Sequence, residues 1–574
     1  MGRQRLLSQT LARAGRWRAG CSIVCDEAMA GYTASAHSTS THHGAVDDAA
    51  AQLTEVVLTG AALTIVEVVA VARHGARVGL DEDALATMAV TRGVVEGLAE
   101  GERPHYGVST GFGALARLHI PTDQRARLQV SLVRSHAAGT GPEVETEVIR
   151  ALQLLRLATL MTGRTGARPV VARCYAAMLN ARLTPVVHEY GSLGCSGDLA
   201  PLAHVALAAM GEGEVRTGDG TLTHAAAALA EAGIEPLVLR EKEGLALING
   251  TDGMLGHLCL ALADLDRLTA TADVAAAMSV EALLGTDRPF APDMMTMRPH
   301  PGQAASAANL QRVLAGSQVM ASHRRRDEEG HEVCTRVQDA YSLRCAPQVH
   351  GAARDTATHA EMVAQRELAS AIDNPVVTPD GRVESNGNFH GAPIAYVLDF
   401  LAIAVADLAS ISERRIDRFL DRSRSEGLPP FLAHEPGVDS GLMIAQYTAA
   451  AIVSELKRLA SPASVDSIPS SAMQEDHVSM GWAAARKLRR AIDGLRRVIA
   501  IEVLTASRGL ELRQRADAEL VPAAASKAVR GLVLARVGAL GSDRFLSPQI
   551  ETVVGLVSSG ALLQAVVAQV GTLD

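Results

Sequence analysis

The chain has 574 residues, of which 48% are hydrophobic and 20% are charged, so a disordered or collagen-like protein is excluded. A net charge of −9 argues against a nucleic-acid binder, whose affinity depends on Lys and Arg neutralising phosphates. Aromatic residues are scarce, with 2 Trp, 7 Tyr and 7 Phe, and Ala and Leu supply the apolar content. This composition favours helices over strands and predicts a mainly α fold.

The cysteines and the apolar stretches limit where the protein is expected to reside. Seven cysteines, an odd number spread over a long chain, do not form a disulfide framework and indicate a reducing cytoplasm. The longest uncharged stretch, residues 552–573, contains Gln564, Gln569 and a Ser-Ser-Gly break. It predicts a packed terminal helix and not a membrane span. Neither nucleic acid nor a membrane is expected as a partner.

Residues 1–54 differ from the rest of the chain. Five arginines precede the first acidic residue, and a Ser/Thr/His-rich stretch follows. Cys21 with Cys25, or His42 with His43, suggest a metal site, but such pairs in polar tails are usually solvated. We predict a disordered extension without chemistry and no bound metal.

The ordered part of the chain divides at about residue 252. Residues 55–252 mix short helical stretches with Gly-rich connections and are predicted as a mixed α/β region. Helical periodicity dominates residues 253–574, with long helices predicted over 254–284, 391–423, 440–460 and 475–513. Helices this long need long neighbours to bury their apolar faces, so a helical bundle is predicted.

The segment with the most chemical information is GSLGCSGDLAPLAH, residues 191–204. Three glycines in seven residues permit close backbone approach, and Pro201 suits the first turn of a helix that Asp198 would cap. A helix-entry turn, or an anion site at a helix N-terminus, is one interpretation of this spacing. Ser196 does not fit a nucleophile elbow, because that motif needs glycine where this chain has Asp198.

The segment resembles the signature of the aromatic amino acid ammonia-lyases, G-S-x-G-A-S-G-D-L-x-P-L. Seven further motifs support the resemblance in chain order: YGVSTGFG (106–113), SHAAG (135–139), LINGT (247–251), QDAYSLR (338–344), GNFH (387–390), SVDS (464–467) and QEDHVSM (474–480). The resemblance covers about residues 55–574. It implies a long central helical bundle of the fumarase/aspartase type, with a smaller mixed N-terminal region that carries the signature loop.

In that family the central tripeptide cyclises and loses two waters to give 4-methylidene-imidazole-5-one (MIO), a self-derived electrophile that replaces an external cofactor. The resemblance assigns this group to Cys195, Ser196 and Gly197. The Gly197 nitrogen would attack the carbonyl carbon of Cys195, which needs a compressed turn and an attacking residue without a side chain. Cys195 replaces the usual Ala, and since only its carbonyl enters the ring, a small side chain is expected to be tolerated.

Glu475 is the position that distinguishes substrates within the family, because the phenylalanine- and tyrosine-directed branches typically have Gln there. A phenyl ring has no hydrogen-bonding group, whereas imidazole has an N–H that a carboxylate accepts. The resemblance therefore implies elimination of ammonia from L-histidine to give trans-urocanate, the first step of histidine degradation. A phenylalanine/tyrosine ammonia-lyase, an aminomutase with the same MIO group and a non-catalytic helical scaffold are the alternatives.

The resemblance also assigns roles to single residues. Tyr106, Ser196 and Tyr341 are the catalytic residues, and Tyr106 would abstract the β-proton if its surroundings lower its pKa from about 10. Arg344 would clamp the substrate carboxylate with two parallel hydrogen bonds. Asn249 would donate to the carbonyl side of the electrophile. Whether the substrate amine or its ring attacks the electrophile is open.

The remaining substrate-binding positions are His136, Gln338, Phe389 and Glu475. Gln338, Tyr341 and Arg344 recur every third residue, so one helical or 3₁₀ turn would place them on one face. Phe389 would pack beside the prosthetic ring. The family resemblance implies a homotetramer with active sites shared between subunits.

Overall fold

A computed structural model of the chain describes residues 45–101, 105–111, 113–115, 117–322 and 337–574. Most of the predicted extension over residues 1–54 therefore lies outside the described residues, and so does Phe112 of the YGVSTGFG motif. The described chain begins with helix α2 (Ala45–Gln52). Asp47 of α2 forms ion pairs with Arg73 and Arg267, so residues 45–54 belong to the folded part of the protein.

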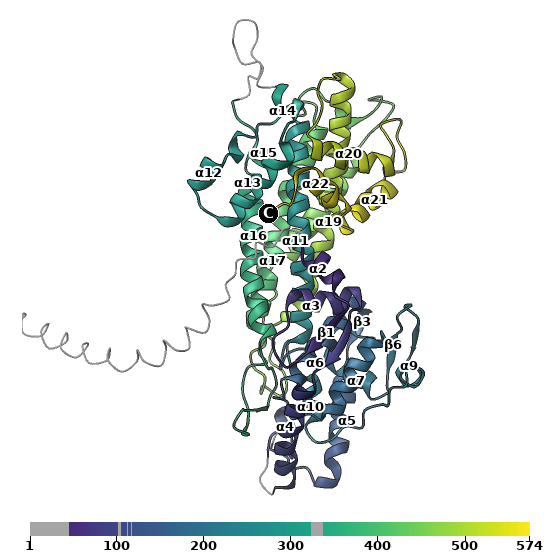
Figure 1. The fold of residues 1–574 in the computed structure, drawn as a ribbon, viewed down its shortest axis with the longest axis vertical. Coiled ribbons are helices and arrows are strands. Elements are labelled where there is room, and N and C mark those ends of the chain that lie inside the picture. The colour runs from purple at the N-terminus through teal and green to yellow at the C-terminus, as the bar shows by residue number, and fades with distance from the viewer. Residues whose placement is uncertain (1–44, 102–104, 112, 116, 323–336) are drawn as a thin grey trace, which may run out of the picture. The chain divides into compact units, whose positions relative to one another are not determined.

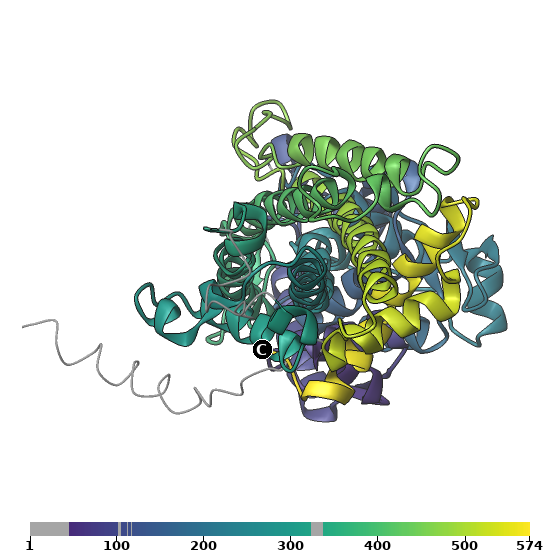
Figure 2. The same ribbon diagram turned by 90° about the horizontal axis from the view of Figure 1, so that it is seen from above.

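Long helices dominate the chain from residue 252 onward, which confirms the mainly helical prediction. They are α11 (Asp252–Ala282), α13 (Pro301–Leu314), α16 (Ala346–Leu368), α17 (Ala392–Leu420), α18 (Met443–Leu459) and α19 (Gly481–Ala516). Figure 1 shows these helices running side by side, and Figure 2 shows them from above. All residues of α11 except Asp266 and Arg267 are buried. Because α6, α13, α16, α17 and α19 pack around it, α11 is buried on every face.

A buried polar cluster joins three of these helices. Arg415 of α17 and Glu502 of α19 form a completely buried ion pair at 2.5 Å. Ser279 of α11 and Ser412 of α17 donate hydrogen bonds to the same carboxylate, at 2.7 and 2.5 Å. A shift of one helix along another would leave a buried charge unpaired, so the cluster favours a single register of the bundle.

The residues before α11 combine short helices with short strands. Its helices are α3 (Ile65–Val69), α4 (Glu82–Glu100), α5 (Arg125–His136), α6 (Thr146–Met161), α7 (Pro169–Asn180), α8 (Leu199–Ala209), α9 (Ala225–Glu231) and α10 (Glu243–Ile248), with a π-helical turn over Ala70–His74. Its strands are β1 (Glu55–Leu58), β2 (Arg77–Leu80), β3 (Thr140–Glu143), β4 (Thr184–Pro185), β5 (His188–Tyr190), β6 (Glu214–Arg216) and β7 (Leu222–His224). The region packs on the bundle mainly through α6 and α11, and the described residues form one compact unit.

The strands form only small sheets among the described residues. β1 and β2 pair in parallel, with Glu55 opposite Arg77, while β3 pairs with β5 and β6 pairs with both β4 and β7 in antiparallel fashion. A hairpin of β8 (Val376–Val377) and β9 (Val383–Glu384) interrupts the helical half of the chain. These short pairs position loops, and helix packing supplies the core.

Further short helices complete the C-terminal half: α12 (Pro292–Thr296), α14 (Gln318–Ser322), α15 (Tyr341–Arg344), α20 (Ala524–Val537), α21 (Ser547–Ser558) and α22 (Ala561–Val570). Short 3₁₀ turns cover Gly113–Leu115, Thr122–Gln124, Arg288–Phe290 and Pro430–Leu432. The predicted single terminal helix over 552–573 is wrong, because α21 and α22 meet at a bend of 59°. The break lies at Gly560, whose φ of +74° ends the helix.

Three of the four predicted long helices have the expected positions, and the fourth begins later than predicted. The prediction of a helix from residue 475 is wrong, because α19 begins at Gly481. Ser471, Ala472 and Met473 all adopt left-handed backbone conformations, with φ between 50 and 69°, and Met480 has φ of 53°. L-residues in this conformation cannot continue a right-handed helix, so residues 470–480 form a loop.

Among the described residues, α17 is the one helix that is long and apolar enough to cross a bilayer by length and composition. The bent pair of α21 and α22 passes the same test when it is counted as a single span. Two-thirds (67%) of the apolar stretch of α17 is buried inside the protein, against α16, α18 and α19. Its apolar character is therefore explained by packing within the bundle.

Candidate active site

The loop between β5 and α8 makes a tight turn around Ser196. Gly194 and Gly197 pair as an antiparallel bridge, and Ser196 between them has a left-handed φ of 61°. Gly197 has φ of 80°, and a Cβ there would lie 2.0 Å from the carbonyl oxygen of Gly250. Only glycine fits at this position. The turn is thus compressed, and Gly197, whose nitrogen would attack the Cys195 carbonyl carbon, has no side chain. The loop therefore fits the cyclisation of residues 195–197 that the motif predicts.

Asn249 contacts Ser196 directly through its side-chain amide. Its Nδ2 donates to the carbonyl oxygen of Asn374 at 2.8 Å and to Oδ1 of Asp373 at 3.3 Å. Both partners can only accept hydrogen bonds, so this side of the amide is the NH₂ group. Asn249 Oδ1 therefore faces Ser196 and accepts a hydrogen bond from its Oγ at 2.5 Å. Toward the Ser196 hydroxyl, Asn249 is therefore an acceptor.

Asp198 begins α8 as predicted, but it does not cap that helix with its side chain. Its carboxylate instead accepts hydrogen bonds from the Met254 N–H of α11 at 2.8 Å and from the Ser192 hydroxyl at 3.1 Å. Burial raises the pKa of Asp198 to about 7, against the effect of these donors. Asp198 thus connects the loop around Ser196 to the N-terminal end of α11.

Glu475 lies on the loop that precedes α19 and faces this turn. Its backbone pairs with that of Ser470, and the Ser470 hydroxyl donates to Glu475 Oε2 at 2.7 Å. Burial raises the pKa of the Cys195 thiol to about 11, and the neighbouring Glu475 carboxylate contributes. The carboxylate that the sequence associates with imidazole recognition is therefore next to the tripeptide.

Tyr106 belongs to the same group of side chains. Its hydroxyl oxygen accepts a hydrogen bond from the Gly113 N–H at 3.4 Å. A Cβ added at Gly113 would lie 3.9 Å from Glu475 Oε1, so the two loops touch. Burial raises the pKa of Tyr106, and the Glu475 carboxylate raises it further, whereas the Gly113 hydrogen bond lowers it. In the single chain the surroundings therefore do not lower this pKa, which is the condition for a role as base, because a buried phenolate beside a carboxylate is disfavoured.

His136 is the last residue of α5 and is held in one tautomer. Its Nδ1 lies 2.9 Å from the Leu132 carbonyl oxygen, which can only accept, so Nδ1 carries the hydrogen. Burial lowers the pKa of His136, although the Leu132 carbonyl and the Glu475 carboxylate oppose this shift. The neutral ring therefore presents Nε2 as an acceptor.

Phe389 lies on the turn before α17 and is half-buried. The adjacent His390 ring stacks on His477 with centroids 5.7 Å apart, which joins this turn to the loop of Glu475. Asn386 on the same turn donates to the carbonyl oxygen of Asp373 at 3.0 Å. The turn therefore belongs to the same end of the molecule as Ser196.

The structure places the remaining predicted residues at the opposite end of α11. Thr286, just after α11, donates its N–H to Asp339 at 2.7 Å, and Asp339 is adjacent to Gln338. Because α11 has 31 residues, this end lies about 45 Å from the Asn249 end. Figure 1 shows α10 and α15 near opposite ends of the long helices. One chain therefore does not bring Gln338, Tyr341 and Arg344 to Ser196.

Tyr341 and Arg344 share one face of α15, as predicted. The Arg344 guanidinium carbon lies 4.6 Å from the centroid of the Tyr341 ring. Tyr341 is 72% exposed, and Gln338, which precedes the helix, is also exposed. This end of the chain thus presents the Tyr341 phenol at the surface, with the half-buried Arg344 guanidinium against its ring.

Sequence reasoning missed three buried residues behind Asn249. Arg156 of α6 donates to the carbonyl oxygens of Asn249 at 2.6 Å and of Ile372 at 2.9 Å. Lys242 and Asp373 form an ion pair at 2.5 Å, and neither side chain is exposed. Lys242 belongs to a charged run, REKE, and charged runs are usually solvated. No local pattern marks these positions as buried.

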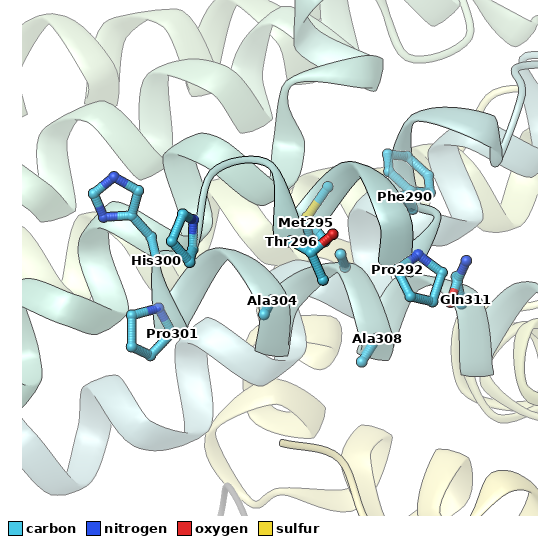
Figure 3. Close-up of a pocket in the computed structure, with 11 residues that line it drawn as sticks. Phe290, Pro292, Met295, Thr296, His300, Pro301, Ala304, Ala308 and Gln311 are labelled. Atoms are coloured by element: carbon cyan, nitrogen blue, oxygen red, sulfur yellow. The ribbon is translucent and has the colours of Figure 1, made fainter.

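A cavity of about 430 Å³ lies between α12 and α13 and is shown in Figure 3. Its walls are mostly apolar, including Phe290, Met295 and Ala304, with His300 and Gln311 as polar members. Phe290 follows the C-terminal end of α11, so the cavity is remote from Ser196. Over the part of the chain that the structure describes, no three His, Cys, Asp or Glu side chains are grouped to hold a metal ion.

Comparison with known proteins identifies the family to which the chain belongs. The profile of the family described as aromatic amino acid lyase matches residues 63–533, and the chain belongs to this family. A histidine ammonia-lyase of Streptomyces avermitilis is 62% identical over 519 residues, which are 90% of this chain and 99% of the relative.

Two solved structures share the fold. The tyrosine aminomutase of Streptomyces globisporus has a TM-score of 0.84 at 40% identity, covering 90% of this chain and 99% of that one. A histidine ammonia-lyase from Trypanosoma cruzi has a TM-score of 0.81 at 38% identity, covering 90% and 96%. The predicted mainly α fold of this lyase family is therefore confirmed.

Proposed function

We propose that this protein deaminates L-histidine to trans-urocanate and ammonia, the first step of histidine degradation. The observation that carries the proposal is the Glu475 carboxylate beside Cys195 and Tyr106. A carboxylate accepts the imidazole N–H, while a phenyl ring offers no donor and would leave the carboxylate unpaired. The names of relatives such as the Streptomyces avermitilis enzyme support the same substrate.

Cys195, Ser196 and Gly197 are proposed to form the MIO group, so no external cofactor is needed. The compressed turn, the left-handed Ser196 and the absence of space beside Gly197 all fit this conversion. Once formed, the group supplies an electrophilic carbon that helps the amine to leave. The Cys195 side chain does not enter the ring.

The other side chains near Ser196 are proposed to orient the substrate and to remove its β-proton. Tyr106 takes the β-proton, and since burial raises its pKa in the single chain, a cation from another source must stabilise its anion. His136 offers Nε2 as an acceptor within the same site. Phe389 supplies an apolar surface. These roles follow from the family motifs and the positions described above.

Arg344 is proposed to bind the substrate carboxylate in two parallel hydrogen bonds, with Tyr341 and Gln338 beside it. Because these residues lie about 45 Å from Ser196 along α11 in the same chain, they must come from another copy. An Arg344 from another copy also supplies the cation that Tyr106 needs. We therefore propose a homotetramer whose active sites are shared between subunits.

Exposed apolar side chains support this association. Tyr396, Phe400 and Ile403 on α17, with Ile444 and Tyr447 on α18, are each between 45% and 58% exposed. A groove of about 530 Å³ runs between α16 and α17 beside Phe400. Apolar surfaces of this kind are typical of contacts between protein chains. Free thiols at the described cysteines agree with the proposed cytoplasmic location.

Incubation of the purified protein with L-histidine, L-phenylalanine and L-tyrosine tests the substrate, with absorbance reporting the unsaturated acids. Urocanate from histidine alone is the expected result, and cinnamate or coumarate would overturn the assignment. An aminomutase is the second candidate, because the tyrosine aminomutase of Streptomyces globisporus shares this fold at a TM-score of 0.84. Formation of a β-amino acid from L-tyrosine, followed by chromatography, would support that candidate instead.

A further inference from the structure

A buried row of polar side chains leads from the protein interior to Ser196. Lys242 Nζ donates to Asp373 Oδ2 at 2.5 Å, and Asp373 Oδ1 accepts from Asn249 Nδ2 at 3.3 Å. Asn249 Oδ1 then accepts from Ser196 Oγ at 2.5 Å. Lys242, Asp373 and Asn249 are almost completely inaccessible to solvent, with exposures of 0%, 1% and 0%.

The row determines which end of the Asn249 amide faces Ser196. Asp373 Oδ1 also accepts the Asn374 N–H at 2.7 Å, which keeps the Asn374 carbonyl oxygen next to Asn249 Nδ2. Two acceptors thus hold the NH₂ group, and rotation of the amide by 180° would place an oxygen against both. Arg156 fixes the Asn249 backbone through its carbonyl oxygen at 2.6 Å.

The ion pair itself is not an efficient way to stabilise the fold. The free energy needed to remove two charges from water offsets most of the electrostatic attraction between them. Apolar residues of similar volume therefore stabilise a protein about equally well. Lys242 also has a left-handed φ of 67° at the start of α10, which is unfavourable for an L-residue. The ion pair instead affects the position of Asn249, because the short helix α10 connects Lys242 directly to Asn249.

We propose that Lys242 and Asp373 are positioning residues for maturation, holding Asn249 so that its Oδ1 orients the Ser196 hydroxyl while the tripeptide cyclises and dehydrates. The proposal rests on the proposed function only in assuming that the MIO group forms. In the reaction, Gly197 N bonds to Cys195 C, and the Cys195 carbonyl oxygen leaves as water with the hydrogens of the Gly197 and Ser196 nitrogens. The Ser196 Cβ–Oγ bond then breaks, and Oγ leaves as a second water with the Ser196 α-hydrogen. No oxidant or reductant is required.

Asn249 affects the loss of the second water, which contains Ser196 Oγ, by fixing the rotamer of the Ser196 side chain. A hydroxyl that donates to a fixed acceptor keeps its Cβ–Oγ bond in one orientation relative to the Cα–H bond that must also break. Without that acceptor, the hydroxyl samples several rotamers. Dehydration then proceeds from only a fraction of the molecules.

The experiment measures dehydration and not turnover. The wild-type chain and two variants, Asn249→Leu and Lys242→Met/Asp373→Leu, are synthesised in a timed pulse and digested, and the mass of the peptide around residues 195–197 is followed with time. Wild type is expected to lose two waters. Asn249→Leu and the double variant are each expected to lose the serine water roughly tenfold more slowly than wild type, the effect of losing or weakening one hydrogen bond. Maturation of either variant at the wild-type rate would overturn the proposal.

A matched control separates positioning from loss of stability. Arg415→Met/Glu502→Leu neutralises another completely buried ion pair in the bundle and is expected to mature at the wild-type rate. Equal slowing of this control would show a general folding effect and overturn the proposal. Asn249→Leu keeps the Lys242–Asp373 pair, so it provides the test if the double variant does not fold. A wild-type chain that loses two waters but makes no urocanate would refute the proposed function alone.

Discussion

Mixing two inactive variants of this chain tests whether one active site draws on two copies. Ser196→Ala removes the hydroxyl at one end of α11, and Arg344→Ala removes the guanidinium near its other end. The two ends are about 45 Å apart in one chain. Neither variant alone is expected to form urocanate, because every site of each oligomer lacks one of the two groups.

The expected recovery follows from the arrangement of the two ends. In a random one-to-one mixture, a complete site needs Ser196 from an Arg344→Ala chain and Arg344 from a Ser196→Ala chain. Each condition is met by half of the chains, so about one quarter of the sites are complete. Co-expression of the two variants is therefore expected to restore about one quarter of the wild-type kcat per chain with an unchanged KM.

The assay follows urocanate by absorbance after co-expression, with two different affinity tags to verify that mixed oligomers form. Ser196→Ala mixed with Asn249→Ala is the matched control, since both residues lie at the same end of one chain and no recovery is expected. Mixed oligomers of Ser196→Ala and Arg344→Ala without activity would refute the shared site. The geometry would then require Arg344 to act elsewhere.

Three further predictions concern the substrate, acid stability and the tripeptide. Glu475→Gln replaces a carboxylate acceptor with a neutral amide and is expected to lower kcat/KM for L-histidine by about tenfold to a hundredfold; an unchanged value would contradict the substrate assignment. Burial beside Trp482 lowers the pKa of His257 to about 3, so the folded state binds fewer protons than the unfolded state below pH about 6.5. The wild type is thus expected to lose about 2 kcal/mol of stability through His257 between pH 7 and pH 5, and His257→Leu should remove this part of the pH dependence of Tm. Gly197→Ala places a methyl group 2.0 Å from the Gly250 oxygen at a φ of 80° and is expected to lower Tm and prevent loss of the two waters, as intact mass would show; full dehydration would contradict the packing argument.

The long helices could be predicted from the sequence because their periodicity is a local property. The stretch 391–423 has apolar residues at helical spacing over more than seven turns, and it forms α17, Ala392–Leu420. The start of α19 could not be predicted in the same way. Residues 475–480 contain no glycine or proline, yet Met480 has a left-handed φ of 53°, and its N–H bonds to the Leu193 carbonyl oxygen of a distant loop at 3.0 Å.

The candidate site was predictable as a set of residue types but not as a geometry. The glycines around Ser196 and the positions of Asn249 and Glu475 follow from motifs in the chain. The direction of the Asn249 amide does not, because it depends on Asp373 and Asn374, which are more than a hundred residues away. The raised pKa of Tyr106 likewise arises from burial and from Glu475, neither of which is a local property.

The sequence by itself determined the helical class, the tripeptide with its chemistry and the carboxylate at residue 475, because each depends on residue identity and short-range spacing. Only the tertiary structure decided that Lys242 is buried, that Asn249 accepts from Ser196, and that Arg344 and that serine lie near opposite ends of α11, a helix about 45 Å long. These facts depend on packing between distant segments. A 31-residue helix separates two motifs that the chain order alone presents as parts of one site.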